Sequence, residues 1–356
     1  SSIWSSLIIT YLGANGDTDS EIKSVLRIKK LSKTAVARAV QGLKFWGDLK
    51  KNMSKSNQLS EKSTYSLANK IFFNDDLRLN ECIEGFFNGD VEKMDFTNKP
   101  SESIERINNW VKDQTQGKIV DLIPNGAINP WTKMILANAV YFNSKWMNQF
   151  QKENTKLQTF YISPTDEIQV EMMTQTGTFM YGISERLQVT ALEMSYANPD
   201  YSMIILLPEP SRGLDTLIRT IKPNDLYELV SNMYDDEIFV SLPKFKIEQH
   251  FELAGPLYSM GIRKLFDPRF VDLSGFFANL NDTKQPIAVN SVIHKTFINV
   301  DEEGTEAAAA SALMFGRSGR PVFPTQFIAN RPFMYLIRDT QTNLILFMGT
   351  VRRPQS

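Results

Sequence analysis

Apolar residues recur at the spacing of an α-helix in several stretches of this chain. The first predicted helix ends at Gly13 and buries one face, which is made of Ile3, Leu7, Ile8, Tyr11 and Leu12. The clearest helix is expected at residues 100–117, and its buried face is made of Ile104, Ile107 and Val111. Further helices are expected at residues 20–27, 34–51, 214–233 and 251–265.

Other stretches are short, apolar and rich in β-branched or aromatic residues, which is typical of strands. They lie at residues 66–73, 132–142, 238–247, 295–301 and 333–339. Two hairpin-like segments are expected at residues 168–180 and 187–207, and the second turns at residues 198–200. The run at residues 132–142 is almost wholly apolar, which predicts a strand buried on both faces. The pattern therefore predicts a mixed α/β protein. Length alone would favour two domains, although no linker, low-complexity tract or repeat divides the chain.

The chain contains few of the residues that usually perform catalysis or hold metals. It has two histidines, His250 and His294, and one cysteine, Cys82. HExxH, CxxC, P-loop and GxGxxG patterns are missing from the sequence, which argues against an enzyme, a metal centre or a bound cofactor. We expect His294 to be a buried, hydrogen-bonded residue on a strand and His250 to lie at the surface. A single cysteine forms no disulfide within the chain, so the redox compartment cannot be deduced.

Charge is distributed unevenly, although the net charge is only −1. Residues 23–62 contain eleven basic and two acidic residues, a local net charge of +9. Basic residues on one face of the helix at 34–51 could hold a sulfated polysaccharide, and the candidates are Arg38, Lys44, Lys50 and Lys51. A merely solvated helix is the alternative. Asn52 and Asn281 each begin an N-glycosylation sequon.

A different kind of segment follows the strand at residues 295–301. Residues 305–311 are Thr, Glu, four Ala and Ser, which bury too little apolar area to anchor a core. Alanine favours a helix, so a helix is one interpretation. Glycines and prolines would break any helix longer than about two turns; these are Gly304, Gly316, Gly319, Pro321 and Pro324. We therefore expect a long loop, and such loops are usually functional.

The tip of this loop carries two arginines, Arg317 and Arg320. An exposed Arg followed by Ser suits a trypsin-like protease, because the Asp of that enzyme's specificity pocket binds the guanidinium. Arg317 precedes Ser318 and is therefore the expected cleavage site. Arg320 is a weaker candidate, because Pro321 follows it and fits the leaving side of the bond badly.

The residues around this loop resemble those of a known family, the serpins, which are serine protease inhibitors. EEGTEAAAAS at residues 302–311 resembles the family's hinge, and FIANRPFMYLIRD and LFMGTVRRP resemble its closing strands. Further matches are LANAVYFNSKW (136–146), SLPKFKIE (241–248), DLSGF (272–276) and VIHKTFINVDEEGTEAA (292–308). The resemblance covers nearly the whole chain.

The resemblance implies one α/β (α+β) domain over residues 1–356 with the serpin fold. That fold has three β-sheets, about eight or nine helices and an exposed reactive-centre loop, here at residues 303–324. In serpins a helix and a strand precede the segment with which this sequence starts. We therefore expect the N-terminal helix, and any secretion signal with it, to be missing.

The resemblance also implies roles for particular residues. The hinge comprises Glu302, Glu303, Gly304, Thr305, Glu306, Ala307, Ala308, Ala309, Ala310 and Ser311. The cluster that controls opening of the main sheet comprises Ser2, Asn138, Trp146, Lys244 and His294. Within it, His294 is expected to pair with Asn138 and Ser2. In some serpins the helix that matches residues 34–51 binds heparin-like chains, which speed inhibition.

The function that the resemblance implies is suicide-substrate inhibition of a trypsin-like serine protease. The protease cleaves after Arg317 and forms an acyl-enzyme, and the freed arm of the loop then inserts as a strand of the main sheet. One face of that strand is small or uncharged, and it is made of Thr305, Ala307, Ala309, Ser311 and Leu313. The family's usual count from Glu302 reaches Ser318, so Ser318 and Arg320 stay alternatives to Arg317.

The loop sequence and the chain as a whole are most similar to those of inhibitory arthropod haemolymph serpins, which restrain clotting or innate-immune cascades. We accordingly expect a secreted, extracellular glycoprotein that is monomeric and needs no cofactor or metal. Its partners would be a protease and a sulfated polysaccharide, not nucleic acid or a membrane. The alternative is a serpin-like carrier or chaperone that never inserts its loop. Small hinge residues favour the inhibitor.

Overall fold

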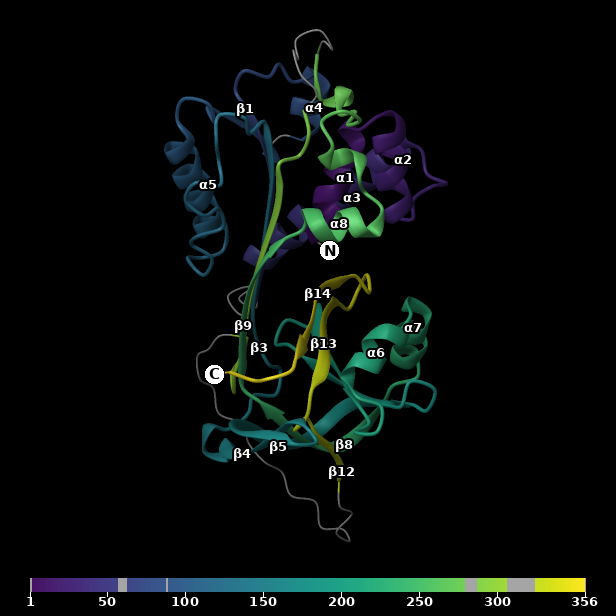
Figure 1. Cartoon of the computed structure of the whole chain (residues 1–356). Helices are drawn as coiled ribbons and strands as arrows, with labels where there is room; N and C mark the ends of the chain where they lie inside the picture. Colours follow the sequence, from purple (N-terminus) through teal and green to yellow (C-terminus); the bar gives the residue numbers. More distant parts are fainter. Residues whose placement is uncertain (1, 57–62, 88, 279–286, 306–323, 356) are drawn as a thin grey trace. The chain divides into compact units, whose positions relative to one another are not determined.

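The computed structural model describes residues 2–56, 63–87, 89–278, 287–305 and 324–355 (Figure 1). They belong to two compact units. One unit comprises Ser1–Asn57, Tyr65–Tyr141 and Glu248–Phe297, and the other comprises Gln58–Thr64, Phe142–Ile247 and Ile298–Ser356. That residues 1–356 form a single domain stays a prediction. In the described part, no helix is both long and apolar enough to span a membrane.

The described residues form eight α-helices. They are α1 (Ser2–Gly13), α2 (Gly16–Val25), α3 (Lys33–Ser56), α4 (Glu81–Phe86), α5 (Pro100–Gln114), α6 (Leu214–Thr220), α7 (Pro223–Ser231) and α8 (Ala254–Met260). Short 3-10 helices are η2 (Lys152–Asn154), η3 (Lys264–Phe266) and η4 (Ser274–Phe276). Helices and strands occur together along the chain, as the sequence predicted.

The first sheet has the strand order β2-β1-β3-β10-β9, and β11 also pairs with β3. Its strands are β1 (Ser63–Asn74), β2 (Val91–Met94), β3 (Met134–Lys145), β9 (Phe245–Glu252), β10 (Ser291–Val300) and β11 (Gly304–Thr305). β3 and β10 are parallel neighbours, in register from Ile135↔Ser291 to Tyr141↔Phe297.

The second sheet has the order β12-β8-β5-β6-β7-β13-β14, with β4 paired to β5. Its strands are β4 (Lys156–Ser163), β5 (Asp166–Ser184), β6 (Val189–Ser195), β7 (Tyr201–Pro208), β8 (Tyr234–Pro243), β12 (Thr325–Ile328), β13 (Phe333–Asp339) and β14 (Ile345–Val351). β5 has 19 residues and pairs with β4, β6 and β8. Because the long strand β5 pairs with β4, β6 and β8, these strands belong to one sheet. The described strands therefore form two sheets, where three were expected.

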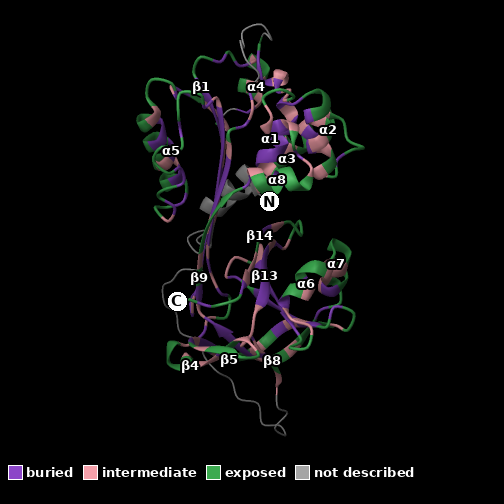
Figure 2. Cartoon of the chain, in the orientation of Figure 1, coloured by how far each residue is buried: buried purple, intermediate pink, exposed green. Residues whose placement is uncertain are grey.

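The first unit has three layers, in which helices cover both faces of the sheet (Figure 1). Alternate residues of β3 point to opposite faces. Ala137 and Tyr141 pack in one apolar cluster with Ile107 of α5, whereas Leu136 packs in another with Leu7 of α1. Along most of its length β3, which lies between these layers, is buried (Figure 2). Burial on both faces explains why β3 is almost continuously apolar.

Some element boundaries differ from those that the sequence predicted. The helices predicted at residues 214–233 are α6 and α7, and Pro223 starts the second of them because it removes a backbone donor and disfavours helical geometry in the residue before it. The predicted helix at 251–265 is shorter, since β9 extends to Glu252 and Gly261 ends α8 with a φ of 114°.

In the second unit, α6 and α7 pack on β6, β7 and β13.

Candidate functional site

The predicted hinge begins in a tight turn after β10. The carboxylate of Asp301 accepts the backbone N–H groups of Glu303 at 3.0 Å and Gly304 at 3.3 Å. The N–H of Asp301 donates in turn to the carbonyl oxygen of Gly304 at 2.9 Å. This turn directs the chain back along β3, where Gly304 pairs with Lys145 and Thr305 with Ser144 in antiparallel register.

Gly304 is required for this pairing. Its φ of +144° lies in a region that residues with a side chain rarely adopt. A Cβ atom at this position would lie 2.3 Å from the carbonyl oxygen of Ser144 and 2.5 Å from the Cα of Lys145. Only glycine therefore allows the hinge backbone to approach β3 this closely.

Trp146 holds the hinge in place with two hydrogen bonds. Its backbone N–H donates to the carbonyl oxygen of Glu303 at 2.8 Å, and its indole N–H donates to that of Asp301 at 3.0 Å. The indole is stacked on Tyr196 with ring centroids 4.6 Å apart. Phe150 adds a third backbone bond, from its N–H to the carbonyl oxygen of Glu302 at 2.8 Å. The hinge turn is thus fixed by buried backbone hydrogen bonds.

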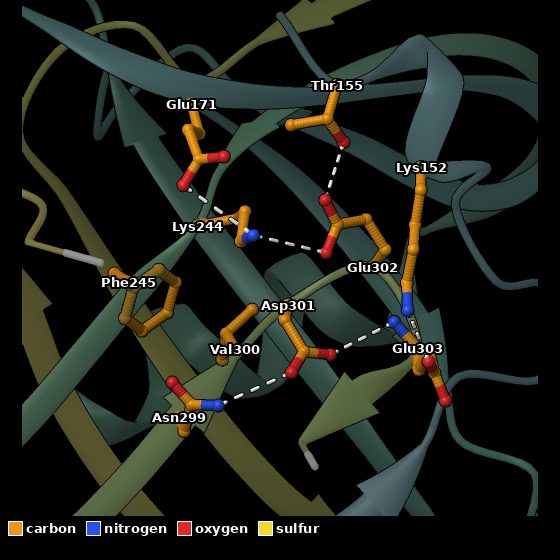
Figure 3. Close-up of a pocket in the computed structure, with 10 residues that line it drawn as sticks. All are labelled: Lys152, Thr155, Glu171, Lys244, Phe245, Asn299, Val300, Asp301, Glu302 and Glu303. Atoms are coloured by element: carbon orange, nitrogen blue, oxygen red, sulfur yellow. Dashed lines mark hydrogen bonds and ion pairs between the residues drawn. The ribbon is translucent and has the colours of Figure 1, made fainter. Parts of the chain in front are cut away.

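Glu302 is buried and has two side-chain partners (Figure 3). The hydroxyl of Thr155 donates to Oε1 at 2.8 Å. The Nζ atom of Lys244 lies 3.4 Å from Oε2, and it also lies 3.6 Å from a carboxylate oxygen of Glu171. Burial would raise the pKa of Glu302, but hydrogen bonds from a backbone N–H and Thr155, together with the Lys244 charge, lower it overall.

Glu303 is also buried, and its cation is different. The Nζ atom of Lys152 lies 2.9 Å from Oε1 of Glu303, and this hydrogen bond raises the pKa of Lys152. Oε2 of Glu303 is buried and has no hydrogen-bond partner among the described residues. For neighbouring Asp301, burial raises the pKa and outweighs the two backbone N–H groups that it accepts.

These groups line a cavity of about 710 Å³ (Figure 3). Its lining residues are Lys152, Thr155, Glu171, Lys244, Phe245, Asn299, Val300, Asp301, Glu302 and Glu303. Four carboxylates and two lysines give the lining a formal charge of −2. Two consecutive hinge glutamates therefore each depend on one lysine for compensation of a buried charge.

A second polar cluster lies in the first unit, between β3 and α1. His294 on β10 is buried, and its Nδ1 atom donates to Oδ1 of Asn138 on β3. The amide group of Asn138 donates to the Ser6 hydroxyl at 3.3 Å and to Oδ1 of Asn69. Burial lowers the pKa of His294 to about 4, so the imidazole is neutral near pH 7. The ring of Phe251 stacks against it.

Residues of the predicted sheet-opening cluster belong to both units. Asn138 and His294 belong to the first unit, whereas Trp146 and Lys244 belong to the second and contact the hinge. The side chain of Ser2 is outside the described residues, so its predicted pairing stays a prediction, and among the described residues Ser6 contacts Asn138. The role of these residues in sheet opening stays a prediction.

Several predicted residues lie outside the described residues. They are Glu306, Ala307, Ala308, Ala309, Ala310, Ser311, Arg317, Ser318, Arg320 and Asn281. Only the backbone is described for Thr305, in β11, and for four residues of α3, which are Lys44, Lys50, Lys51 and Asn52. Arg38 of α3 and His250 of β9 are exposed.

Sequence reasoning missed several residues of these clusters, among them Ser6, Asn69, Lys152 and Thr155. Lys152 is the first residue of η2, a 3-10 helix of three residues that carries no motif, and Thr155 directly follows this helix. They meet Glu302 and Glu303 across roughly 150 positions of sequence, for instance 147 between Thr155 and Glu302. Periodicity reports which residues share a face of one element, but not which distant elements meet.

Comparisons with known proteins agree on one family. The sequence profile described as "Serpin (serine protease inhibitor)" matches residues 1–354. The chain is 34% identical over 374 residues to Serine protease inhibitor 88Ea of Drosophila melanogaster, covering 100% of this chain and 84% of that protein.

Solved structures of other proteins are similar to this chain over nearly its whole length. The structure of Serpin48 from the insect Tenebrio molitor, described as a highly specific serpin, is 30% identical, with a TM-score of 0.78 and coverage of 99% of this chain and 90% of that chain. Human thyroxine-binding globulin in its ligand complex is 25% identical, with a TM-score of 0.83 and coverage of 100% and 91%. The predicted mixed α/β serpin fold is thus confirmed, and the chain belongs to the serpin family, which is described as a family of serine protease inhibitors and not of enzymes.

Proposed function

We propose that this protein is a suicide-substrate inhibitor of a trypsin-like serine protease. The observation that carries the proposal is the position of the hinge, whose residues Gly304 and Thr305 already pair with β3. They do so beyond Tyr141, the last residue of β3 that pairs with β10. Further residues of the cleaved loop could extend this antiparallel pairing, and the Ala-rich sequence offers no bulky or charged side chain on one strand face.

Insertion would release enough free energy to damage a bound protease. About a dozen newly paired residues, at roughly 1 kcal/mol net per hydrogen bond, give on the order of 10 kcal/mol. A typical domain is stable by about 5 to 15 kcal/mol. Distortion of the protease's active site, with its acyl-enzyme still linked to Arg317, is therefore energetically feasible.

The test is to mix the full chain with trypsin and separate the products on a denaturing gel. We expect a band of the summed mass that resists boiling and a released C-terminal fragment that begins at Ser318. A fragment beginning at Gly319 or Pro321 would assign the scissile bond to Ser318 or Arg320 instead. Complete cleavage without a stable complex would overturn the proposed inhibition.

Finer features of the proposal concern the biological setting. Similarity to the Drosophila melanogaster and Tenebrio molitor proteins supports an inhibitor like those of insects. Secretion and a role in a clotting or innate-immune cascade are part of the same proposal. Glycans on Asn52 and Asn281 belong to the same proposal, as does acceleration by a heparin-like polyanion that contacts Arg38, Lys44, Lys50 and Lys51. Equal rates of trypsin inhibition with and without heparin would contradict the polyanion role.

A carrier function is the second candidate, supported by the similarity to thyroxine-binding globulin. A carrier needs no loop insertion. It would be cleaved by trypsin without forming the complex, and a small apolar ligand would raise its melting temperature. The gel experiment therefore separates the two functions.

A further inference from the structure

Asparagine followed by glycine is a chemically reactive pair. The backbone nitrogen of the glycine can attack the asparagine side chain, because glycine has no Cβ atom that hinders the approach. The sequence contains three such pairs, at residues 15–16, 88–89 and 125–126. Asn88 lies outside the described residues. The first and the third pair are both described, and they differ in how firmly the asparagine is held.

Asn15 is held by its side chain and by its backbone. Its amide nitrogen donates to the hydroxyl of Ser274 at 2.8 Å, and its Oδ1 atom accepts from the Nζ atom of Lys33 at 3.1 Å. Its backbone N–H donates to the carbonyl oxygen of Asp272 at 2.9 Å, and its own carbonyl oxygen accepts the N–H of Asp19 at 3.1 Å. Attack on this amide would first have to break both side-chain hydrogen bonds.

The third pair lies in an exposed turn of the segment that joins α5 to β3. We call this segment, residues 115–133, the strap. The N–H of Ala127 donates to the carbonyl oxygen of Pro124 at 3.2 Å, and Gly126 has a φ of +82°, as in a type II turn. The residues of the turn are exposed. In the described part of the chain, the side chain of Asn125 makes no hydrogen bond that would hold its amide in place.

We propose that Asn125 is a site of spontaneous deamidation and isoaspartate formation. The backbone nitrogen of Gly126 attacks the Cγ atom of Asn125 and forms an N–Cγ bond. The bond from Cγ to Nδ2 breaks, and ammonia leaves with the proton of the Gly126 N–H. Water then opens the cyclic imide at either carbonyl. Opening at the side-chain carbonyl gives aspartate, and opening at the backbone carbonyl gives isoaspartate, which isoaspartate-specific methyltransferases recognise.

The strap is anchored on both sides of this turn. On one side, Oδ1 of Asn108 in α5 accepts the N–H of Ile123 at 2.8 Å, and its Nδ2 atom donates to the carbonyl oxygen of Ile123 at 2.9 Å. On the other side, Ile128 is buried in the apolar cluster that also contains Ile123 and Ile107 of α5. Isoaspartate at position 125 adds one atom to the backbone between these anchors. The extra length is therefore expected to displace the buried part of the strap.

The first test follows both pairs in the full chain during incubation in mildly alkaline buffer, with peptide mass spectrometry as the readout. Because two side-chain hydrogen bonds must break before Asn15 reacts, Asn125 should convert roughly tenfold faster or more. The matched control is the same chain unfolded in urea, in which the two pairs are chemically equivalent and should convert at similar rates. Similar rates in the folded protein, or conversion of Asn125 only after unfolding, would overturn the proposal.

A second test identifies the product. The incubated wild type should accept labelled methyl groups from an isoaspartate-specific methyltransferase. Asn125→Gln should lose most of this label, because glutamine needs a larger ring and cyclises far more slowly. An undiminished label in Asn125→Gln would assign the isoaspartate to another position and contradict the proposal.

A third test measures the effect on the strap. The incubated wild type should melt about 1–3 °C below incubated Asn125→Gln, because only the wild type gains the extra backbone atom at this position. Fresh Asn125→Asp is the control for charge, and it should melt like the fresh wild type, since an exposed charge contributes little. Equal melting temperatures of the two incubated proteins would contradict the expected displacement. None of these measurements uses a protease, so their outcome is independent of the proposed inhibition.

Discussion

Lys152 and Glu303 form an ion pair in which only the lysine is exposed: Nζ lies 2.9 Å from Oε1, and the side chains are 68% and 7% exposed. Replacing Lys152 by alanine leaves the carboxylate buried without its cation. Because Oε2 of Glu303 has no described partner either, the free energy of unfolding should fall. Urea unfolding of the uncleaved protein measures this loss.

The double variant K152A/E303Q provides the control for this prediction. A glutamine at position 303 removes the buried charge, so the loss seen in Lys152→Ala should be partly recovered. Lys152→Arg should be nearly neutral. If the single and double variants unfold at the same urea concentration, then Glu303 does not depend on Lys152.

Gly304→Ala should displace the hinge from β3, because the added Cβ would lie 2.3 Å from the carbonyl oxygen of Ser144. Gly126→Ala is the matched control: Gly126 also has a positive φ, +82°, but nothing lies within 4 Å of the position of its Cβ. Backbone strain of about 1–2 kcal/mol is common to both variants. The clash should cost Gly304→Ala roughly 1–3 kcal/mol more. Hydrogen exchange of the amides of β11 and the end of β3 should be faster in this variant alone.

His294 should make the stability of the protein depend on pH. Burial lowers its pKa from 6.5 to about 4, so below pH 6.5 the unfolded chain binds a proton that the folded chain does not. Stability is therefore expected to fall as the pH drops from about 6.5 to 4, by up to about 3 kcal/mol. Urea unfolding at several pH values should show a smaller slope in this range for His294→Gln. The same substitution at exposed His250 should leave the slope unchanged.

The sequence predicted best those features that one element determines alone. The apolar spacing of Ile104, Ile107 and Val111 defined the buried face of α5, and all three pack in the cluster beneath it. Spacing could not show that Ser6 contacts Asn138, because this contact depends on where β3 meets α1 in the folded unit.

At the hinge, too, the sequence pattern did not predict contacts between distant elements. Its small residues and Gly304 could be recognised in the sequence, since glycine and alanine have a direct conformational meaning. The partners of Glu302 could not, because Thr155 and Lys244 come from distant segments that meet only in the folded unit. Sequence patterns therefore predicted where the site lies but not which charges hold it.

Thr305→Arg tests insertion itself. Thr305 is the first residue of the arm that follows Gly304 in β11, and an inserted arm would place its side chain inside the sheet. Burial of an unpaired guanidinium costs several kcal/mol, so insertion should become much slower than release of the cleaved inhibitor. We expect trypsin to cleave this variant as a substrate, with at least a tenfold smaller fraction of stable complex on a denaturing gel. Thr305→Ser, which keeps a small hydroxyl, should form the complex as the wild type does. An undiminished complex with Thr305→Arg would show that trapping does not require insertion at this position.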